Sequence, residues 1–196
     1  MWASLRRSRY SSRMTDLYTI PVTRIDGTQT SLGDYRGKVL LIVNVASKCG
    51  LTPQYGALEK TYARFREAGL QVLGFPANDF AGQEPGSDAE IAQFCSSTFG
   101  ASFPMFSKVQ ATGPSKHPLY AELTEALPES AGEGKARFIE GLVKYGIQPN
   151  EEPELLWNFE KFLVGREGKP VARFSPDTLP DAAVVTQAIE AELSKR

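Results

Sequence analysis

The sequence predicts a single α/β domain. Two strongly aliphatic runs, at residues 38–47 and 70–75, flank a stretch whose apolar residues have the spacing of a helix. Such a β-α-β unit forms a parallel strand pair with a right-handed crossover. The chain has 196 residues, of which 41% are hydrophobic and 23% charged, and this size and composition suit one hydrophobic core.

The first expected element is a β-hairpin. The sequence LYTIPVTRI, beginning at Leu17, reads as a strand, Asp26-Gly27 is a strong turn signal, and TQTSL reads as the second strand. The next run, KVLLIVNVAS at 38–47, is almost continuously aliphatic. Strands that are buried on both faces of a sheet have this character, so we expect it at the sheet centre.

A helix is expected between the two aliphatic strands. Thr52 is predicted to cap it, with Pro53 in its first turn and Gly69 at its end. Its apolar face consists of Tyr55, Leu58, Tyr62 and Phe65. A further helix is expected over 88–98 with Ser87 as its cap, and its apolar side consists of Ile91, Phe94 and Cys95.

The second half of the chain is less regular. Residues 125–154 are rich in Glu, Gly and Pro, and we expect a surface excursion with one short helix near 136–144. A second hairpin is predicted from strands at 155–164 and 170–174. The last predicted helix, 180–194, has the apolar positions Val184, Val185, Ile189 and Leu193. This element order fits a thioredoxin-like sheet with an added N-terminal hairpin.

The first 13 residues differ from the rest. They contain four arginines and no acidic residue, which is the composition of an organellar transit peptide. The alternative is a start codon placed too early, with Met14 as the first residue. In both cases we expect residues 1–13 to be disordered and 14–196 to form the domain. We expect a cytoplasmic protein, with organelle targeting as the alternative.

Composition excludes several classes of function. The 22 basic and 23 acidic residues give a net charge of −1, so no nucleic-acid partner is expected. Two cysteines and the single His117 argue against a disulfide scaffold, a histidine metal site and a Ser-His-Asp triad. No P-loop or G-x-G-x-x-G is present, so no cofactor is expected. The longest apolar run, 39–46, is too short for membrane insertion.

Cys49 is the first candidate for chemistry. It follows the predicted central strand and precedes a helix whose first amides are unpaired, and Lys48 adds a positive charge beside it. Both features favour the thiolate, which is the reactive form of cysteine. The alternative is a small apolar residue in a loop. The position therefore indicates a nucleophile, without identifying the electrophile.

Five blocks of this sequence, in the family's order, resemble the glutathione peroxidase family. They are NVASKCGLTPQY (44–55), FPANDFAGQEPGSDAEI (75–91), FGASFPMFSKV (99–109), HPLY (117–120) and LLWNFEKFLVGREGK (155–169). The resemblance covers residues 15–194 and is to the cysteine-containing bacterial branch, whose members often use thioredoxin. It implies a thioredoxin-like fold and the reduction of hydroperoxides.

The resemblance also implies a set of catalytic residues. Cys49 takes the place of the selenocysteine of some relatives, and the family's active-site glutamine, tryptophan and asparagine fall on Gln83, Trp157 and Asn158. Their N–H groups would stabilise the thiolate and the charge that moves onto the leaving oxygen. Read without the family, Trp157 is a core residue and the two amides are turn or surface residues.

Cys95 is implied as a resolving cysteine, which condenses with the oxidised Cys49 to form a disulfide. In two-cysteine relatives this residue lies on the helix before an F-x-x-x-F-P block, which begins here at Phe99; the best-known motif would place it at Ser96. The alternative is a buried helix cysteine that only packs. If Cys95 resolves, its helix must partly unwind, because disulfide formation requires Cα atoms within about 7 Å.

Two other polar residues are assigned no catalytic role. The first is Asp79. Many relatives have Asn-Gln where this chain has Asn78-Asp79, and a carboxylate at this position would oppose formation of the Cys49 thiolate. His117 is expected to cap or pack at the start of a helix.

The sequence therefore predicts a thiol peroxidase that uses no metal or organic cofactor. Thioredoxin is favoured over glutathione as the reductant because a protein disulfide suits exchange with a dithiol protein. A monomer is expected. A peroxide-sensing relay and a glutathione-regenerated one-cysteine peroxidase are the alternatives. A thiol–disulfide oxidoreductase is disfavoured because Thr52 replaces the second cysteine of C-x-x-C.

Overall fold

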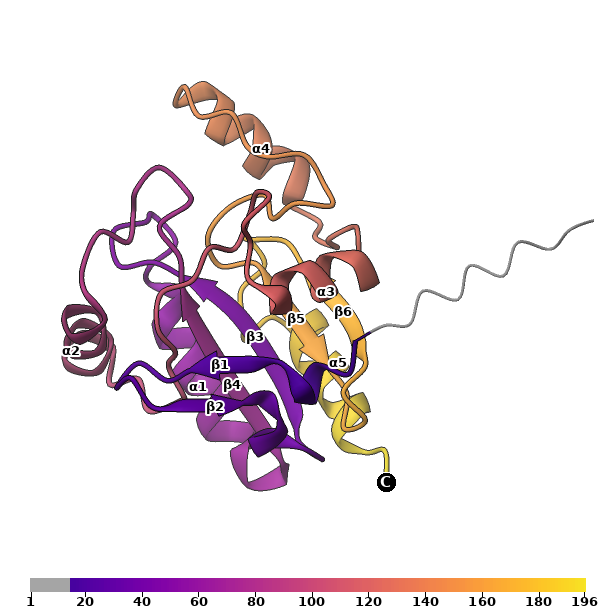
Figure 1. Cartoon of the computed structure of the whole chain (residues 1–196). Helices are drawn as coiled ribbons and strands as arrows, with labels where there is room; N and C mark the ends of the chain where they lie inside the picture. Colours follow the sequence, from indigo (N-terminus) through magenta and orange to yellow (C-terminus); the bar gives the residue numbers. More distant parts are fainter. Residues whose placement is uncertain (1–14) are drawn as a thin grey trace, which may run out of the picture.

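A four-stranded mixed sheet, in the order β4-β3-β5-β6, forms the centre of the computed structural model, which describes residues 15–196 (Figure 1). β3 (Val39–Val45) and β4 (Leu70–Pro76) are parallel, whereas β5 (Lys161–Val164) is antiparallel to both β3 and β6 (Pro170–Phe174). Every residue of β3 is buried, as its aliphatic sequence predicts. The expected extension at 1–13 lies outside the described residues.

The β-α-β unit and the N-terminal hairpin are both present. α1 (Gln54–Phe65) connects β3 to β4, and a 3-10 turn (Arg66–Ala68) closed by the left-handed Gly69 ends it. β1 (Pro21–Thr23) and β2 (Gln29–Ser31) pair in antiparallel fashion.

Two local details of these segments were predicted wrongly. Leu17–Thr19 form a 3-10 turn rather than the start of a strand, because the Asp16 side chain accepts a hydrogen bond from the Tyr18 amide. Thr52 does not cap α1, which begins at Gln54 without a side-chain cap. Its hydroxyl instead accepts a hydrogen bond from the Cys49 amide.

Four further helices complete the described chain. α2 (Asp88–Phe99) begins with a capping box, in which Ser87 and Glu90 bond to each other's backbone amides. α3 (Pro118–Ala126) is capped by His117, whose Nδ1 accepts from the Leu119 amide. The short helix expected within the excursion is α4, and the final helix is α5; they span Lys135–Lys144 and Ala183–Leu193.

The helices cover the sheet unequally. α1 and α5 lie on one face, while α3 and the β1–β2 hairpin lie on the other, and α4 projects away from the body (Figure 1). In α5, Val185 and Ile189 are buried as expected, but Val184 is 54% exposed because it faces away from the sheet.

A buried ion pair and its hydrogen bonds attach the surface excursion, residues 125–154, to the sheet. Arg173 on β6 pairs with Glu160 at 2.5 Å, and both side chains are fully buried. The same guanidinium donates to the backbone carbonyls of Leu127, Pro153 and Glu154, at both ends of the excursion. Removal of either charged partner would leave the other buried and unpaired, which is strongly destabilising.

Among residues 15–196, no helix is long and apolar enough to cross a membrane. The same part of the chain contains no cluster of three or more His, Cys, Asp or Glu side chains placed to hold a metal ion.

Candidate active site

The Cys49 loop lies between the carboxyl end of β3 and the start of α1. Its backbone is held by Thr52, whose hydroxyl accepts from the Cys49 amide at 2.9 Å and donates to the Ala46 carbonyl at 2.9 Å. The Leu51 amide donates to Cys49 Sγ at 3.3 Å. Cys49 is 8% exposed. The sulfur is therefore held in a fixed position, with a backbone donor directed at it.

Asn44 attaches a distant segment to this end of β3. It is fully buried, its Nδ2 donates to the Trp157 carbonyl at 3.1 Å, and its Oδ1 accepts from the Glu160 amide at 3.0 Å. Its own carbonyl accepts from the Phe159 amide. Sequence reasoning missed this role, although a polar residue in a doubly buried aliphatic strand is the signal that could have found it.

The same contacts explain why β5 is shorter than predicted. Residues 155–160 are irregular because the Phe159 and Glu160 amides bond to Asn44 instead of joining the sheet ladder. Phe159 has a φ of 64°, in the left-handed region, which is incompatible with a strand. Trp157 and Asn158 consequently precede the hairpin and do not form its first strand.

Gln83 and Asn158 meet, although 75 residues separate them in sequence. Asn158 Nδ2 donates to Gln83 Oε1 at 2.9 Å, and Asn158 is fully buried. The Lys48 amide donates to the Gln83 carbonyl at 3.0 Å, which fixes the Gln83 segment beside the Cys49 loop. Trp157, at 5% exposed, packs on Phe80 with ring centroids 5.5 Å apart. The structure thus brings the segments of all four expected residues to the end of β3.

Cys95 occupies a different environment, on the inner face of α2. It is 2% exposed, its thiol donates to the Ala92 carbonyl of its own helix at 3.4 Å, and both cysteines are free. Burial raises the pKa of the Cys95 thiol, so this environment disfavours the thiolate.

An aromatic cluster joins α2 to the centre of the site. The ring of Tyr55 on α1 stacks on Phe99 at 5.4 Å and meets Phe159 edge to face at 5.7 Å. Phe94 also packs edge to face against Tyr55. Any movement that frees Cys95 must disturb these contacts.

Comparison with known proteins decides the family. The family model for glutathione peroxidase matches residues 17–124. A relative from Escherichia coli K12, the thioredoxin/glutathione peroxidase BtuE, is 49% identical over 91% of this chain and 98% of its own length. The chain belongs to the glutathione peroxidase family. It is therefore a peroxidase, as the resemblance implied.

Other family members support the same assignment. The hydroperoxy fatty acid reductase gpx1 of Synechocystis is 44% identical over 84% of this chain and 89% of its own length. The crystal structure of T. cruzi GPX1 matches with a TM-score of 0.65 at 30% identity, covering 91% of this chain and 96% of that one.

The fold prediction is also confirmed. A thioredoxin-family thiol:disulfide interchange protein from Chlorobium tepidum matches with a TM-score of 0.57 at 12% identity, over 93% of this chain and 99% of that one. At this identity the likeness concerns the fold alone. This member of the glutathione peroxidase family therefore has a thioredoxin-like fold with an added N-terminal hairpin.

Glu84 is a second residue that sequence reasoning missed in this peroxidase. It directly follows Gln83 and is fully buried. Burial raises the pKa of its carboxyl, while the charge of Lys108 acts in the opposite direction. No local pattern in the sequence marks this residue as buried, because the burial depends on how α2 packs.

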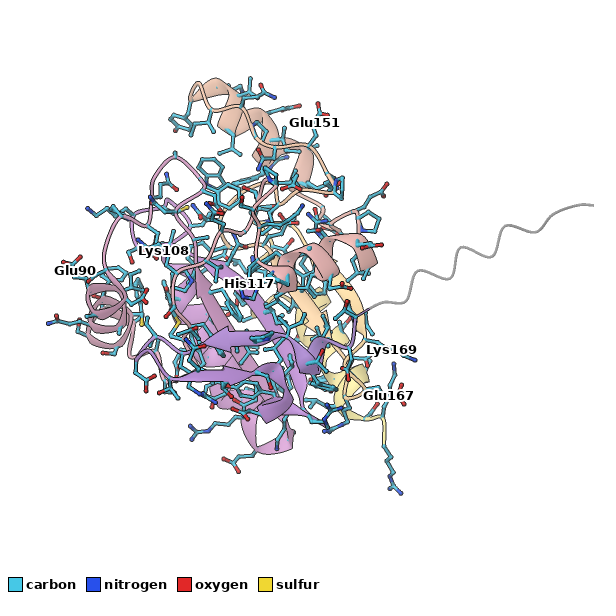
Figure 2. The ribbon with its side chains drawn as sticks, in the orientation of Figure 1. Glu90, Lys108, His117, Glu151, Glu167 and Lys169 are labelled. Atoms are coloured by element: carbon cyan, nitrogen blue, oxygen red, sulfur yellow. The ribbon has the colours of Figure 1, made fainter. Side chains whose placement is uncertain are left out.

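A hollow of about 370 Å³ separates the Cys49 loop from α2 beside Glu84. Ser47 and Lys48 line it on the side of the loop, and Glu90 and Phe94 line it on the side of the helix. Figure 2 labels Glu90, which lines this hollow, and Lys108; both lie on the side of the molecule that carries α2.

The two residues that were assigned no catalytic role have structural partners. His117 lies at the start of α3, well apart from Glu90 of α2 (Figure 2), and caps its own helix. Asp79 accepts hydrogen bonds from the backbone amides of Ala111 and Thr112. Its carboxylate therefore stabilises that loop.

Proposed function

We propose that Cys49 is the peroxidatic cysteine of this enzyme, which reduces hydrogen peroxide and organic hydroperoxides. The Cys49 thiolate attacks one oxygen of the substrate, the O–O bond breaks, and a sulfenic acid forms on Cys49. The leaving oxygen departs as hydroxide or alkoxide and gains a proton to give water or an alcohol. The Leu51 amide donates a hydrogen bond to Sγ and so helps to hold the nucleophile in place for this attack.

The observation that carries this proposal is the hydrogen bond between Asn158 and Gln83 next to the Cys49 loop. Because Gln83 Oε1 accepts from Asn158, the orientation of the Gln83 amide is fixed and its NH₂ group is left to donate. We assign Gln83, Asn158 and the Trp157 indole the task of stabilising charge on the sulfur and the leaving oxygen. Preorganised donors of this kind require no rearrangement during the reaction.

Cys95 is proposed to resolve the sulfenic acid. Its thiol attacks Cys49 sulfur, an S–S bond forms, and the hydroxyl group leaves as water with the thiol proton. Because Cys95 is 2% exposed on the inner face of α2, this step requires α2 to open locally. The resulting disulfide favours a dithiol protein such as thioredoxin as the reductant. The name of the Escherichia coli relative includes both thioredoxin and glutathione.

Intact mass spectrometry tests the cycle. Reduced wild-type protein and Cys95→Ser each receive one equivalent of hydroperoxide without a reductant. A loss of about two mass units in the wild type, and a gain of roughly 16 or 32 in the variant, supports the Cys49–Cys95 cycle.

Two other results would contradict parts of the proposal. A mass gain in both proteins would mean that Cys95 only packs, and would favour glutathione or a partner thiol as the reductant. No mass change in either protein would mean that Cys49 is not peroxidatic.

A further inference from the structure

Glu84 has no role in the reaction steps described above. Its side chain is fully buried, and neither carboxyl oxygen has a hydrogen-bond partner in the described part of the chain. The backbone around it is fixed, because the Glu84 amide donates to Asn78 Oδ1 at 2.9 Å and the Lys48 amide donates to the Gln83 carbonyl. Burial of a carboxyl group without a partner costs free energy, so its place in the fold calls for an explanation.

Glu84 lies between the two cysteine regions. It lines the hollow of about 370 Å³ that separates the Cys49 loop from α2. Ser47 lines the hollow on the side of the loop, and its hydroxyl is also buried without a partner among the described residues. Phe94, which directly precedes Cys95, lines the side of α2. When α2 opens, the Cys95 thiol therefore has to cross a hollow that Glu84 borders.

Glu84 and Cys95 already influence each other while α2 is closed. Burial raises the pKa of the Cys95 thiol, and the negative charge of Glu84 raises it further. The charge of Lys108 lowers the pKa of the Glu84 carboxyl against the effect of burial, and Lys48 and Glu90 line the same hollow. Two negative charges close together are disfavoured, so the Cys95 thiolate forms more easily once Glu84 has been neutralised. Transfer of the thiol proton to Glu84 does both at once.

The resolving step needs a base here, because the attacking group is a thiolate and the pKa of Cys95 is raised. The Tyr55 hydroxyl interacts with both groups, but its pKa lies well above the ordinary value, so it stays protonated. The Glu90 carboxylate is engaged in the capping box of α2, and His117 lies apart at the start of α3 (Figure 2). Burial shifts the pKa of Glu84 toward neutral pH, where a general base is most effective.

We propose that Glu84 is the general base of the resolving step. This inference rests on the proposed role of Cys95, and it deepens that role by naming the group that takes the thiol proton. When α2 opens, the Glu84 carboxylate accepts this proton and the Cys95 thiolate attacks the Cys49 sulfur.

The step is balanced in atoms and electrons. The S–S bond forms as the S–O bond of the sulfenic acid breaks, so the Cys95 sulfur is oxidised and the Cys49 sulfur is reduced. The departing hydroxide takes the proton from Glu84 and leaves as water. Glu84 returns to its carboxylate form, ready for the next cycle.

Rapid-quench mass spectrometry separates the two chemical steps. Reduced full-length protein receives one equivalent of hydrogen peroxide, and samples are quenched at successive times. A gain of about 16 mass units records the sulfenic acid, and a loss of about two records the disulfide. In Glu84→Gln, the ratio of the rate of disulfide formation to the rate of sulfenic acid formation should fall about a hundredfold, so the sulfenic acid accumulates.

The pH dependence of disulfide formation distinguishes a base from a structural support. In the wild type, the rate should rise as the Glu84 carboxyl loses its proton and then level off. In Glu84→Gln the thiol must ionise unaided, so the rate should rise about tenfold per pH unit up to the raised pKa of Cys95. Glu84→Asp keeps a carboxylate and should retain the wild-type profile at a lower plateau.

Glu90→Gln is the matched control. It removes a negative charge from the same hollow, and glutamine can still complete the capping box of α2. Both rates should equal those of the wild type. Hydrogen exchange of the α2 amides shows whether any variant changes the opening of the helix.

Three results would overturn the inference. Glu84→Gln could form the disulfide as fast as the wild type, or Glu90→Gln could be slowed equally. Glu84→Gln could also be slower with the wild-type pH profile and with slower hydrogen exchange in α2, which would mean that Glu84 supports helix opening and takes no proton. If the wild type forms the sulfenic acid and no disulfide, the proposed role of Cys95 fails, and the role of Glu84 fails with it.

Discussion

The two cysteine regions of this peroxidase have opposite designs. Cys49 lies on a loop whose backbone is tied by Thr52, with the Leu51 amide directed at its sulfur. Cys95 lies within a regular helix, its thiol bonded to the helix's own Ala92 carbonyl, in an environment that raises its pKa.

This difference indicates a division of labour. The Cys49 region is already ordered by these hydrogen bonds, so the proposed peroxide step is expected to need no rearrangement. The Cys95 region, as it stands, keeps its thiol from reacting. The thiol is buried, its raised pKa favours the protonated form, and the Tyr55 aromatic cluster covers it. Oxidation of Cys49 and opening of α2 are therefore expected to be separable steps.

The largest expected effect comes from Cys49 itself. Cys49→Ser should lower the rate of hydroperoxide reduction by at least about a thousandfold, because serine is not ionised in this loop. Cys95→Ser serves as the matched control and should retain the first oxidation step. Single-turnover kinetics with hydrogen peroxide measure the rate of this oxidation step in both variants. Full turnover by Cys49→Ser would reject the mechanism.

The donors beside Cys49 should have the next largest effect. Gln83→Ala or Asn158→Ala is expected to slow the peroxide step by about 10²–10³-fold, as loss of one preorganised donor does in other enzymes. Gln93→Ala, at an exposed position on α2, is the control and should leave the rate unchanged. The oxidation rate of each variant is measured by stopped flow, and circular dichroism shows whether each variant is folded. An unchanged rate in either donor variant would remove that residue from the site.

Asn44 should affect both stability and the site. Asn44→Ala removes two buried hydrogen bonds and leaves the Glu160 amide and the Trp157 carbonyl without their partner, so it should cost about 2–4 kcal/mol. Urea unfolding measures the free energy. Asn150→Ala removes a single bond from an exposed residue and should cost about 1 kcal/mol or less. Equal costs for the two variants would show that Asn44 does not hold the Trp157 segment.

The smallest effect concerns Glu84, between the two cysteine regions. Burial raises the pKa of its carboxyl above the ordinary 4.5, so the folded protein keeps a proton that the unfolded chain releases. This contribution to stability is complete below pH 4.5 and is lost as pH rises through the raised pKa. The Glu84→Gln variant should therefore lose less stability than the wild type as the pH rises from 4.5 through the raised pKa.

Urea unfolding over a pH series tests this difference. Glu140→Gln, at an exposed position on α4, is the control and should follow the wild-type curve. If Glu84→Gln also follows the wild-type curve, Glu84 does not titrate as its burial indicates.

Much of the fold could be predicted from local sequence. The aliphatic run of β3, the 3–4 spacing in α1 and the Ser87–Glu90 capping box predict their elements because each signal lies within a few residues. Val184 shows the limit of this reasoning, since apolar character alone did not reveal that it faces away from the sheet.

By itself, the sequence determined the position of Cys49 between a buried strand and a helix, because that arrangement is local. Only the tertiary structure brought Gln83 to Asn158 across 75 residues. It also stopped the second hairpin at Lys161, because Asn44 takes the backbone amides that would otherwise extend the strand. Hydrogen bonds between distant segments depend on the path of the whole chain, and no local pattern encodes that path.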